Sequence, residues 1–137
     1  MRERGQVSLL IIGFATILLA LVAVVVDASQ VVLLRRSLAS VADGAALAAA
    51  QSLAERALYA GEAVDALPID PRRARQEVVS YLDATGMPLT LVDVSIDGDK
   101  VTVAVAAQAR LPLVGAVTGD ADGTTVTARA SARSPIG

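Results

Sequence analysis

The chain has 137 residues, with 12 basic and 14 acidic side chains, no histidine and no cysteine, and its net charge is −2. The slight acidic excess and the scarcity of aromatic residues argue against a nucleic-acid surface, because such surfaces are basic and often stack bases on aromatic rings. Without cysteine or histidine the chain lacks disulfides, thiol nucleophiles and the usual general base. We therefore predict no enzymatic activity, no cofactor and no small-molecule substrate.

The first predicted element is an apolar helix from Gly5 to Val26, which contains no charged residue and no proline. At about 1.5 Å per residue, this helix would be about 30 Å long, the thickness of the hydrocarbon core of a bilayer. The sequence therefore predicts a single transmembrane helix that serves as an uncleaved signal anchor. The alternatives are a cleaved signal peptide, whose apolar region usually has about 7–15 residues, and a buried core helix, which rarely has so long an apolar run.

The charges that flank this run predict its orientation. Arg2 and Arg4 precede it and Asp27 follows it, which favours a cytoplasmic N-terminus and a C-terminal part outside the cytoplasmic membrane. Arg35 and Arg36 lie further along the chain and count against this orientation. The expected localisation is the bacterial cytoplasmic membrane.

Helical signals continue beyond the membrane. Asp27 to Ala60 is rich in alanine, the best helix former, and contains no proline. We therefore expect one helix from about Gln6 to about Tyr59, with residues 1–26 as cytoplasmic tip and transmembrane helix and residues 27–137 as an extracytoplasmic head. The expected buried stripe, with spacings of three and four, comprises Val31, Leu34, Leu38, Val41, Ala45 and Ala48.

A face of small and polar residues runs along this helix and across the membrane boundary. Small faces let membrane helices approach closely, and threonine can form hydrogen bonds between them, although small residues are also common in such helices without a role. Asp43 is expected either to make a specific contact within an alanine-packed assembly or to be a solvated acid. The predicted helix-packing interface comprises Gly13, Thr16, Ala20, Ala23, Asp27, Asp43 and Ala46.

Gly61 is expected to close the long helix, and a second, shorter helix is predicted after a connector from Glu62 to Asp70. Asp70 is a suitable N-cap and Pro71 a suitable first helical residue, and the helix is expected to end at Thr85 before Gly86. Its expected apolar side comprises Ala74, Val78, Val79 and Leu82. Its arginine cluster is either a solvated face or a site for an anionic partner, and comprises Arg72, Arg73 and Arg75.

Three strands are predicted in the rest of the chain. From Leu89 the apolar period becomes two, and Asp97–Lys100 is a turn that predicts a hairpin. Residues 111–117 are apolar but broken by Pro112 and Gly115, and they are expected to form a docking loop or a short irregular segment. Residues 124–133 alternate again. The predicted fold class is α+β, with an antiparallel sheet packed on the alanine-rich helix, because a three-stranded sheet needs a cover. The expected inward residues of the first two strands are Val92, Val94, Ile96, Val101, Val103, Val105 and Ala107.

Acidic pairs at two turns are weak candidates for calcium, because carboxylate oxygens are its preferred ligands. Asp97 and Asp99 form one pair, and Asp120 and Asp122 the other. The glutamate that completes a calcium loop does not follow the second pair, and Asp and Gly are also ordinary turn residues. The expected metal content is therefore none.

The N-terminal region resembles the TadE/TadG-like proteins of the tight-adherence (Flp) pilus systems. The resemblance covers roughly residues 2–52, and its most specific part is the run from Val41 to Ala50, VADGAALAAA. The other matching features are a basic residue and glycine before the apolar span, an acid after it and an arginine pair, namely Arg4, Gly5, Asp27, Arg35 and Arg36.

The resemblance implies a minor pilin-like or pilus-assembly subunit of a short form, with other pilin-like or Tad subunits and the lipid bilayer as partners. Some family members resemble pseudopilins that are cut after a glycine and carry a glutamate at the fifth mature position. Gly5 is the candidate processing site here, and the fifth residue after it is Leu10. A membrane-tethered binding module unrelated to pili is the alternative function, and a cleaved, secreted protein is a third.

Overall fold

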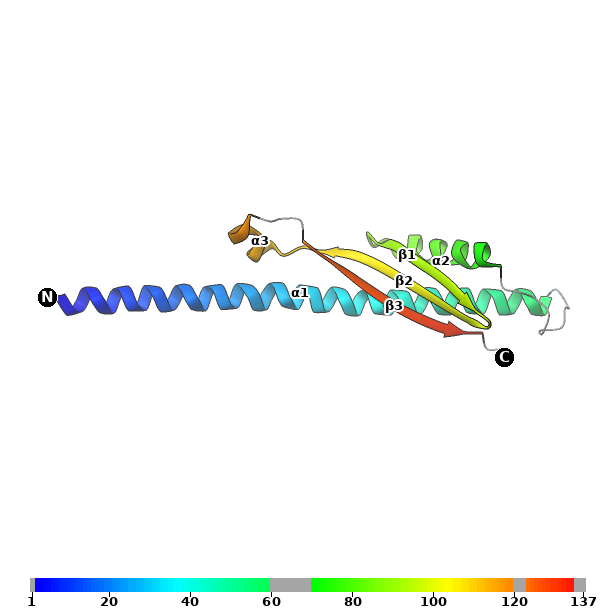
Figure 1. The fold of residues 1–137 in the computed structure, drawn as a ribbon, viewed down its shortest axis with the longest axis horizontal. Helices are drawn as coiled ribbons and strands as arrows, with labels where there is room; N and C mark the ends of the chain where they lie inside the picture. The colour runs from blue at the N-terminus through cyan, green and yellow to red at the C-terminus, as the bar shows by residue number, and fades with distance from the viewer. Residues whose placement is uncertain (1, 60–69, 120–122, 135–137) are drawn as a thin grey trace. The chain divides into compact units, whose positions relative to one another are not determined.

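The computed structural model describes residues 2–59, 70–119 and 123–134. The chain forms two compact units, Met1–Leu33 with Ala109–Thr124, and Leu34–Gln108 with Thr125–Gly137. The fold is α+β, and its sheet has the strand order β1-β2-β3. The elements in chain order are α1 (Arg2–Tyr59), α2 (Pro71–Thr85), β1 (Thr90–Asp97), β2 (Lys100–Ala109), α3 (Pro112–Thr118) and β3 (Thr124–Arg133) (Figure 1).

The long helix α1 confirms the prediction of one uninterrupted helix. Within the described residues it runs from Arg2 to Tyr59, and it begins about one turn earlier than expected. No proline interrupts it, and alanine dominates its second half, so its backbone hydrogen bonds can continue without a break. The predicted helix stop at Gly61 lies outside the described residues.

Alanine and valine side chains form the core of the second unit. Leu38 and Ala45 are fully buried as predicted, while Val41 and Ala48 at the edges of the expected stripe are half-buried. Alanine presents only a methyl group, so a sheet can approach the helix backbone closely. The fully buried residues at the centre of this core are Ala42, Ala45, Ala46 and Ala49 on α1 and Val101, Val103 and Val105 on β2.

The helix α2 packs against β1 and against α1. The carboxylate of Asp70 accepts a hydrogen bond from the backbone N–H of Arg72 at 3.0 Å, and Gly86 ends the helix with φ 66°, so both predicted caps are confirmed. The prediction was wrong for Val79, which is 40% exposed, because α2 turns Tyr81 rather than Val79 toward α1. A Cβ at Gly44 of α1 would collide with the Tyr81 hydroxyl group.

A β-bulge changes the inward face of β1. The register pairs Leu91 with Val105 and Asp93 with Ala104, so Val92 is an extra residue on β1. The expectation that Val92 faces inward was therefore wrong, and its side chain is 52% exposed. Leu91 takes the inward position in its place and is half-buried. The alternation predicted for Val94 and Ile96, beyond the bulge, is confirmed by their half-buried side chains.

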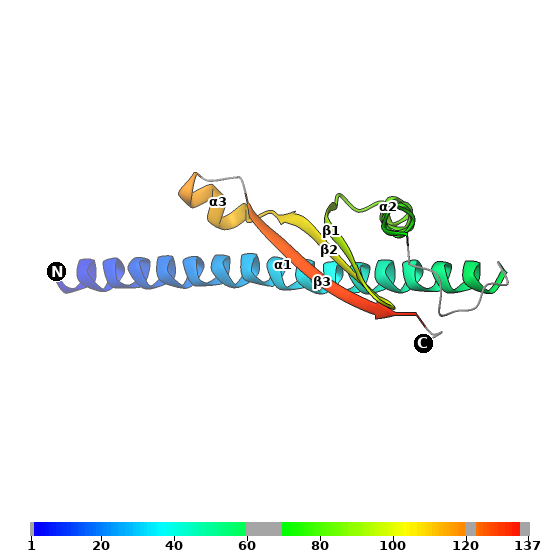
Figure 2. The ribbon, with the colours of Figure 1, turned by 45° about the vertical axis from the view of Figure 1, so that its right-hand side comes forward.

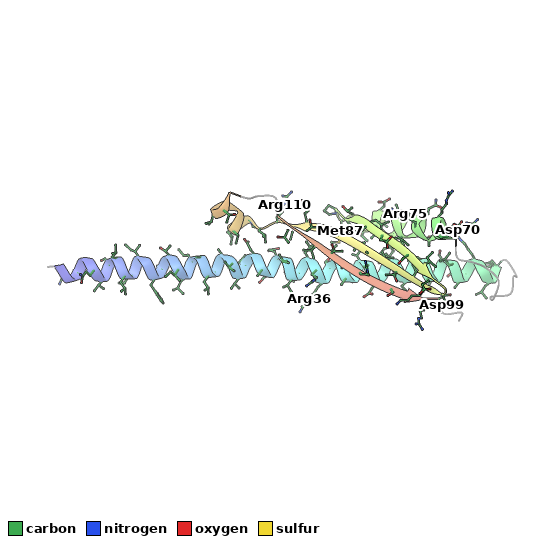
Figure 3. The ribbon with its side chains drawn as sticks, in the orientation of Figure 1. Arg36, Asp70, Arg75, Met87, Asp99 and Arg110 are labelled. Carbon is green, nitrogen blue, oxygen red and sulfur yellow. The ribbon has the colours of Figure 1, made fainter. Side chains whose placement is uncertain are left out.

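The hairpin between β1 and β2 turns on two residues. Asp97 pairs with Lys100, which leaves Gly98 and Asp99 as the loop, and Gly98 has φ 60°. A positive φ at the first loop position matches a type II′ turn, the form that suits the twist of the strands. Asp99 lies at the tip of the hairpin (Figure 3), and its carbonyl oxygen accepts a hydrogen bond from the backbone N–H of Ser134 at 2.9 Å.

Candidate membrane anchor and subunit-packing surface

The apolar half of α1 exposes its large side chains on every side. In the described chain one helix, Arg4–Arg56, is long and apolar enough to cross a membrane; its most apolar window has a mean hydropathy of 3.1, and none of that window is buried. Between Gly5 and Val26 the exposed large residues include Leu9 at 75% and Leu18 at 49%. A core helix of a soluble protein would bury such residues, and water-soluble surfaces rarely present so large an apolar area. This half of α1 therefore fits a membrane anchor.

The predicted packing face within this half is open. Gly13 has no atom within 4 Å of the position where a Cβ would lie, and Thr16 and Ala20 are exposed. The hydroxyl group of Thr16 donates a hydrogen bond to the carbonyl oxygen of Ile12 at 2.8 Å, one turn earlier in the same helix. These three residues thus remain available to another helix, and the threonine hydroxyl group is satisfied without one.

Asp27, at the end of the apolar run, is buried and only 2% exposed. One of its carboxylate oxygens accepts a hydrogen bond from the backbone N–H of Val114 at 2.6 Å, and the other accepts a longer one from Leu113 at 3.4 Å. These N–H groups belong to the first turn of α3, which has no partner for them within the helix. Asp27 therefore caps a helix that lies far away in the sequence.

The expectation that residues 111–117 are irregular was wrong, because Pro112–Thr118 form α3. Pro112 is suited to the first helical position, and Gly119 ends the helix with φ 75°. Leu111 occupies the N-cap position and its side chain makes no capping hydrogen bond. The carboxylate that replaces the local cap comes from α1, so the neighbouring sequence did not reveal this helix.

The short helix α3 lies beside the blue, N-terminal part of α1 (Figure 2), and two hydrogen bonds hold its first turn against Asp27. Ala23 lies one turn before Asp27 on the same side of α1. It is half-buried, whereas the other described residues from Arg4 to Val26 are exposed. Asp27 thus contacts α3 of its own chain, and this use of the predicted face was not visible in the sequence.

The segment between β2 and β3, which contains α3, begins and ends at neighbouring residues, Ala109 and Gly123. Gly123 has φ 67°, and a Cβ at this residue would collide with the carbonyl oxygen of Ala109. The end of β2 and the start of β3 therefore touch, and α3 belongs to an excursion between two neighbouring strands.

The remaining predicted interface residues lie in the second unit. Ala46 is fully buried in the core of its own chain, whereas Asp43 is exposed. Among the residues that the structure describes, Asp43 has no ion pair. The structure thus places Ala46 in the core and Asp43 on the surface.

Gly5 and the acidic turn residues have open surroundings. Gly5 lies within α1, and no atom lies within 4 Å of the position that a Cβ would take there. Asp97 and Asp99 are exposed at the hairpin, while Asp120 and Asp122 lie outside the described residues. In ranges 2–59, 70–119 and 123–134, no three acidic, histidine or cysteine side chains gather as metal ligands would.

The arginine cluster of α2 is exposed. Arg73 lies 3.7 Å from the carboxylate of Asp70, and Arg72 and Arg75 are solvent-accessible. Figure 3 shows Arg75 directed away from the sheet. The solvated face and the site for an anionic partner both remain compatible with this arrangement.

Comparison with known proteins shows which class of protein the N-terminal region is similar to. Residues 5–52 match the model of the family described as "Putative Flp pilus-assembly TadE/G-like". This match confirms the resemblance noted in the sequence, and together with the exposed apolar helix it fits a membrane component of a Tad pilus. No curated protein and no solved structure matches the chain.

Proposed function

We propose that this protein is a membrane-anchored structural subunit, minor pilin-like or an assembly component, of a Tad-type (Flp) pilus or a related secretion system. The observation that carries the proposal is the coincidence of the family match with one structural element. Residues 5–52 lie wholly within α1, and they contain both the exposed apolar run and most of the alanine-rich stripe. In this proposal α1 is both the anchor and the scaffold of the extracytoplasmic head.

The proposed topology places the N-terminus in the cytoplasm and the head outside the cytoplasmic membrane. Arg4 before the apolar run supports this orientation. Arg35 and Arg36 are exposed on the part of α1 beyond the membrane, and Figure 3 shows Arg36 directed away from the sheet, where water can solvate its charge. The proposed role is structural, because the sequence has no histidine or cysteine that could serve catalysis.

The proposed partners are other pilin-like subunits, which would pack against the open face that contains Gly13, Thr16 and Ala20. Because Gly13 has open space in its own chain, a leucine there disturbs only a neighbouring helix. Gly13→Leu is therefore expected to reduce co-purification with other pilin-like subunits. Val22→Leu, which enlarges an exposed residue on another face of the helix, is the matched control.

The decisive experiment is deletion of the gene followed by electron microscopy of the cells. Loss of Flp-type pili, restored by the wild-type gene and less well by the Gly13→Leu variant, would support the proposal. Normal pili after deletion would contradict it and would favour a membrane-tethered binding module. N-terminal mass spectrometry of the mature protein would show whether the chain begins at Met1 or after Gly5.

A further inference from the structure

We propose that α3 is a second membrane contact, which enters the lipid at the level of the membrane surface beside the end of the apolar run. This inference rests on the proposed function only in assuming that α1 spans the bilayer. The occupant proposed for the exposed face of α3 is lipid. Three observations support this inference: the position of α3, the apolar character of its side chains, and the hydrogen bonds that its backbone N–H groups make.

The position of α3 is fixed by Asp27, the first residue after the apolar run. The hydrogen bonds from Leu113 and Val114 hold the start of α3 against Asp27, and the helix lies beside the blue, N-terminal part of α1 (Figure 2). Ala23 of α1, one turn before Asp27, is half-buried, as expected if α3 lies beside it. If α1 spans a bilayer, α3 is therefore next to the lipid-facing surface of α1 and continuous with it.

The side chains of α3 suit lipid better than water. The helix contains no charged residue, and the nearest charged residues in the sequence are Arg110 before it and Asp120 after it. Val117 is 86% exposed and Leu113 is 40% exposed. Apolar side chains on an interfacial helix gain free energy when they leave water for the boundary between headgroups and acyl chains.

The N–H groups of α3 are satisfied without water. Pro112 has no N–H group, Asp27 accepts from the next two residues, and the N–H of Gly115 bonds to the carbonyl oxygen of Leu111 at 2.8 Å. At the other end the N–H of Gly119 bonds to Gly115 at 2.9 Å, and the hydroxyl group of Thr118 bonds to Val114 at 3.0 Å. Unsatisfied backbone groups are what normally keep a chain segment out of lipid. Here a buried carboxylate removes that penalty at the helix start.

The test uses single-cysteine variants of the full chain, which has no cysteine of its own. Val117→Cys is the probe, Leu18→Cys reports the transmembrane helix, and Thr127→Cys on an exposed position of β3 reports the aqueous head. Each variant is labelled with an environment-sensitive fluorophore and reconstituted in phosphatidylethanolamine and phosphatidylglycerol vesicles. Nitroxide lipids then quench the fluorophore either near the lipid carbonyl groups or near the bilayer centre.

The proposal predicts that the label at Val117 loses most of its emission to the shallow nitroxide, that the label at Leu18 loses most of its emission to the deep one, and that the label at Thr127 keeps its emission. Quenching at Leu18 without quenching at Val117 would overturn the second contact and leave the anchor intact. A third outcome is that nitroxide lipids do not quench the label at Val117 and that, before labelling, a soluble thiol reagent does not reach the cysteine there. This outcome would show that protein covers α3, and it would also overturn the proposal. Absence of quenching at Leu18 would overturn the anchor and the proposed function with it.

Discussion

The carboxylate of Asp27 accepts a hydrogen bond from the backbone N–H of Val114 at 2.6 Å, although the two residues are 87 positions apart in the sequence. The bond joins the end of the apolar run to the start of α3. The acid that directly follows the apolar run thus has a definite partner inside the protein. Its removal is the most informative single change in the first unit.

We predict that Asp27→Ala frees α3 from α1. The variant leaves two backbone N–H groups without an acceptor, and the loss of such a cap destabilises a helix by about 0.5–2 kcal/mol. Hydrogen exchange of the Leu113 and Val114 amides is expected to rise in detergent micelles. Asp27→Asn keeps an oxygen that can accept one bond, so its amides should exchange at an intermediate rate. Unchanged exchange in the alanine variant would show that the cap is dispensable.

Gly44→Ala should destabilise the second unit. The new methyl group would meet the hydroxyl group and ring of Tyr81, and overpacking of this kind typically costs about 1–3 kcal/mol. Urea unfolding followed by circular dichroism measures the change. Gly13→Ala is the matched control, since no atom lies within 4 Å of its added carbon and the better helix propensity of alanine should be neutral or stabilising.

A second substitution tests whether the Tyr81 hydroxyl group causes the loss of stability in Gly44→Ala. Tyr81→Phe in the Gly44→Ala background removes the closest atom, so it should restore part of the lost stability. If the double variant is no more stable than Gly44→Ala, the hydroxyl group is not the source of the conflict.

The start of β3 is expected to be intolerant of a side chain at Gly123. Its positive φ alone costs a non-glycine residue about 1–2 kcal/mol, and the collision with the Ala109 carbonyl group adds to that cost. Gly119→Ala provides the comparison, because Gly119 has φ 75° but open space around it. Urea unfolding should therefore show a larger loss for Gly123→Ala than for Gly119→Ala, and equal losses would place the whole effect in the backbone angle.

Ser52→Ala is predicted to stabilise the protein. The hydroxyl oxygen of Ser52 is buried and has no hydrogen-bond partner among the described residues. An unsatisfied buried polar group costs about 1–3 kcal/mol, part of which alanine recovers. Ser40→Ala, at an exposed position of the same helix, measures the gain from helix propensity alone. A gain at Ser52 no larger than at Ser40 would mean that water reaches the buried hydroxyl group.

Local patterns in the sequence were sufficient for the elements whose causes are local. The length of α1 followed from its alanine content and lack of proline, and both caps of α2 followed from Asp70 and Gly86. The buried side of α1 was predictable in part from the spacing of apolar residues: Leu38 and Ala45 are buried, and the other four residues of the expected stripe are half-buried.

The errors arose where a distant contact decides the structure. The bulge at Val92 depends on how β1 pairs with β2, which the period of two cannot show. The helix α3 depends on Asp27, whose separation from it makes the cap invisible to any local motif. A helix-start proline at Pro112 without a neighbouring capping residue, together with an acid directly after the apolar run, was the available signal.

The contact between Gly123 and Ala109 makes the segment between β2 and β3 an insertion that the sheet does not need. Because β2 and β3 already meet there, the sheet does not depend on the length of the intervening chain, and loop closure becomes only slightly less favourable as a loop lengthens. The segment between these strands can therefore be exchanged, shortened or fused to a reporter while the register of the sheet is retained.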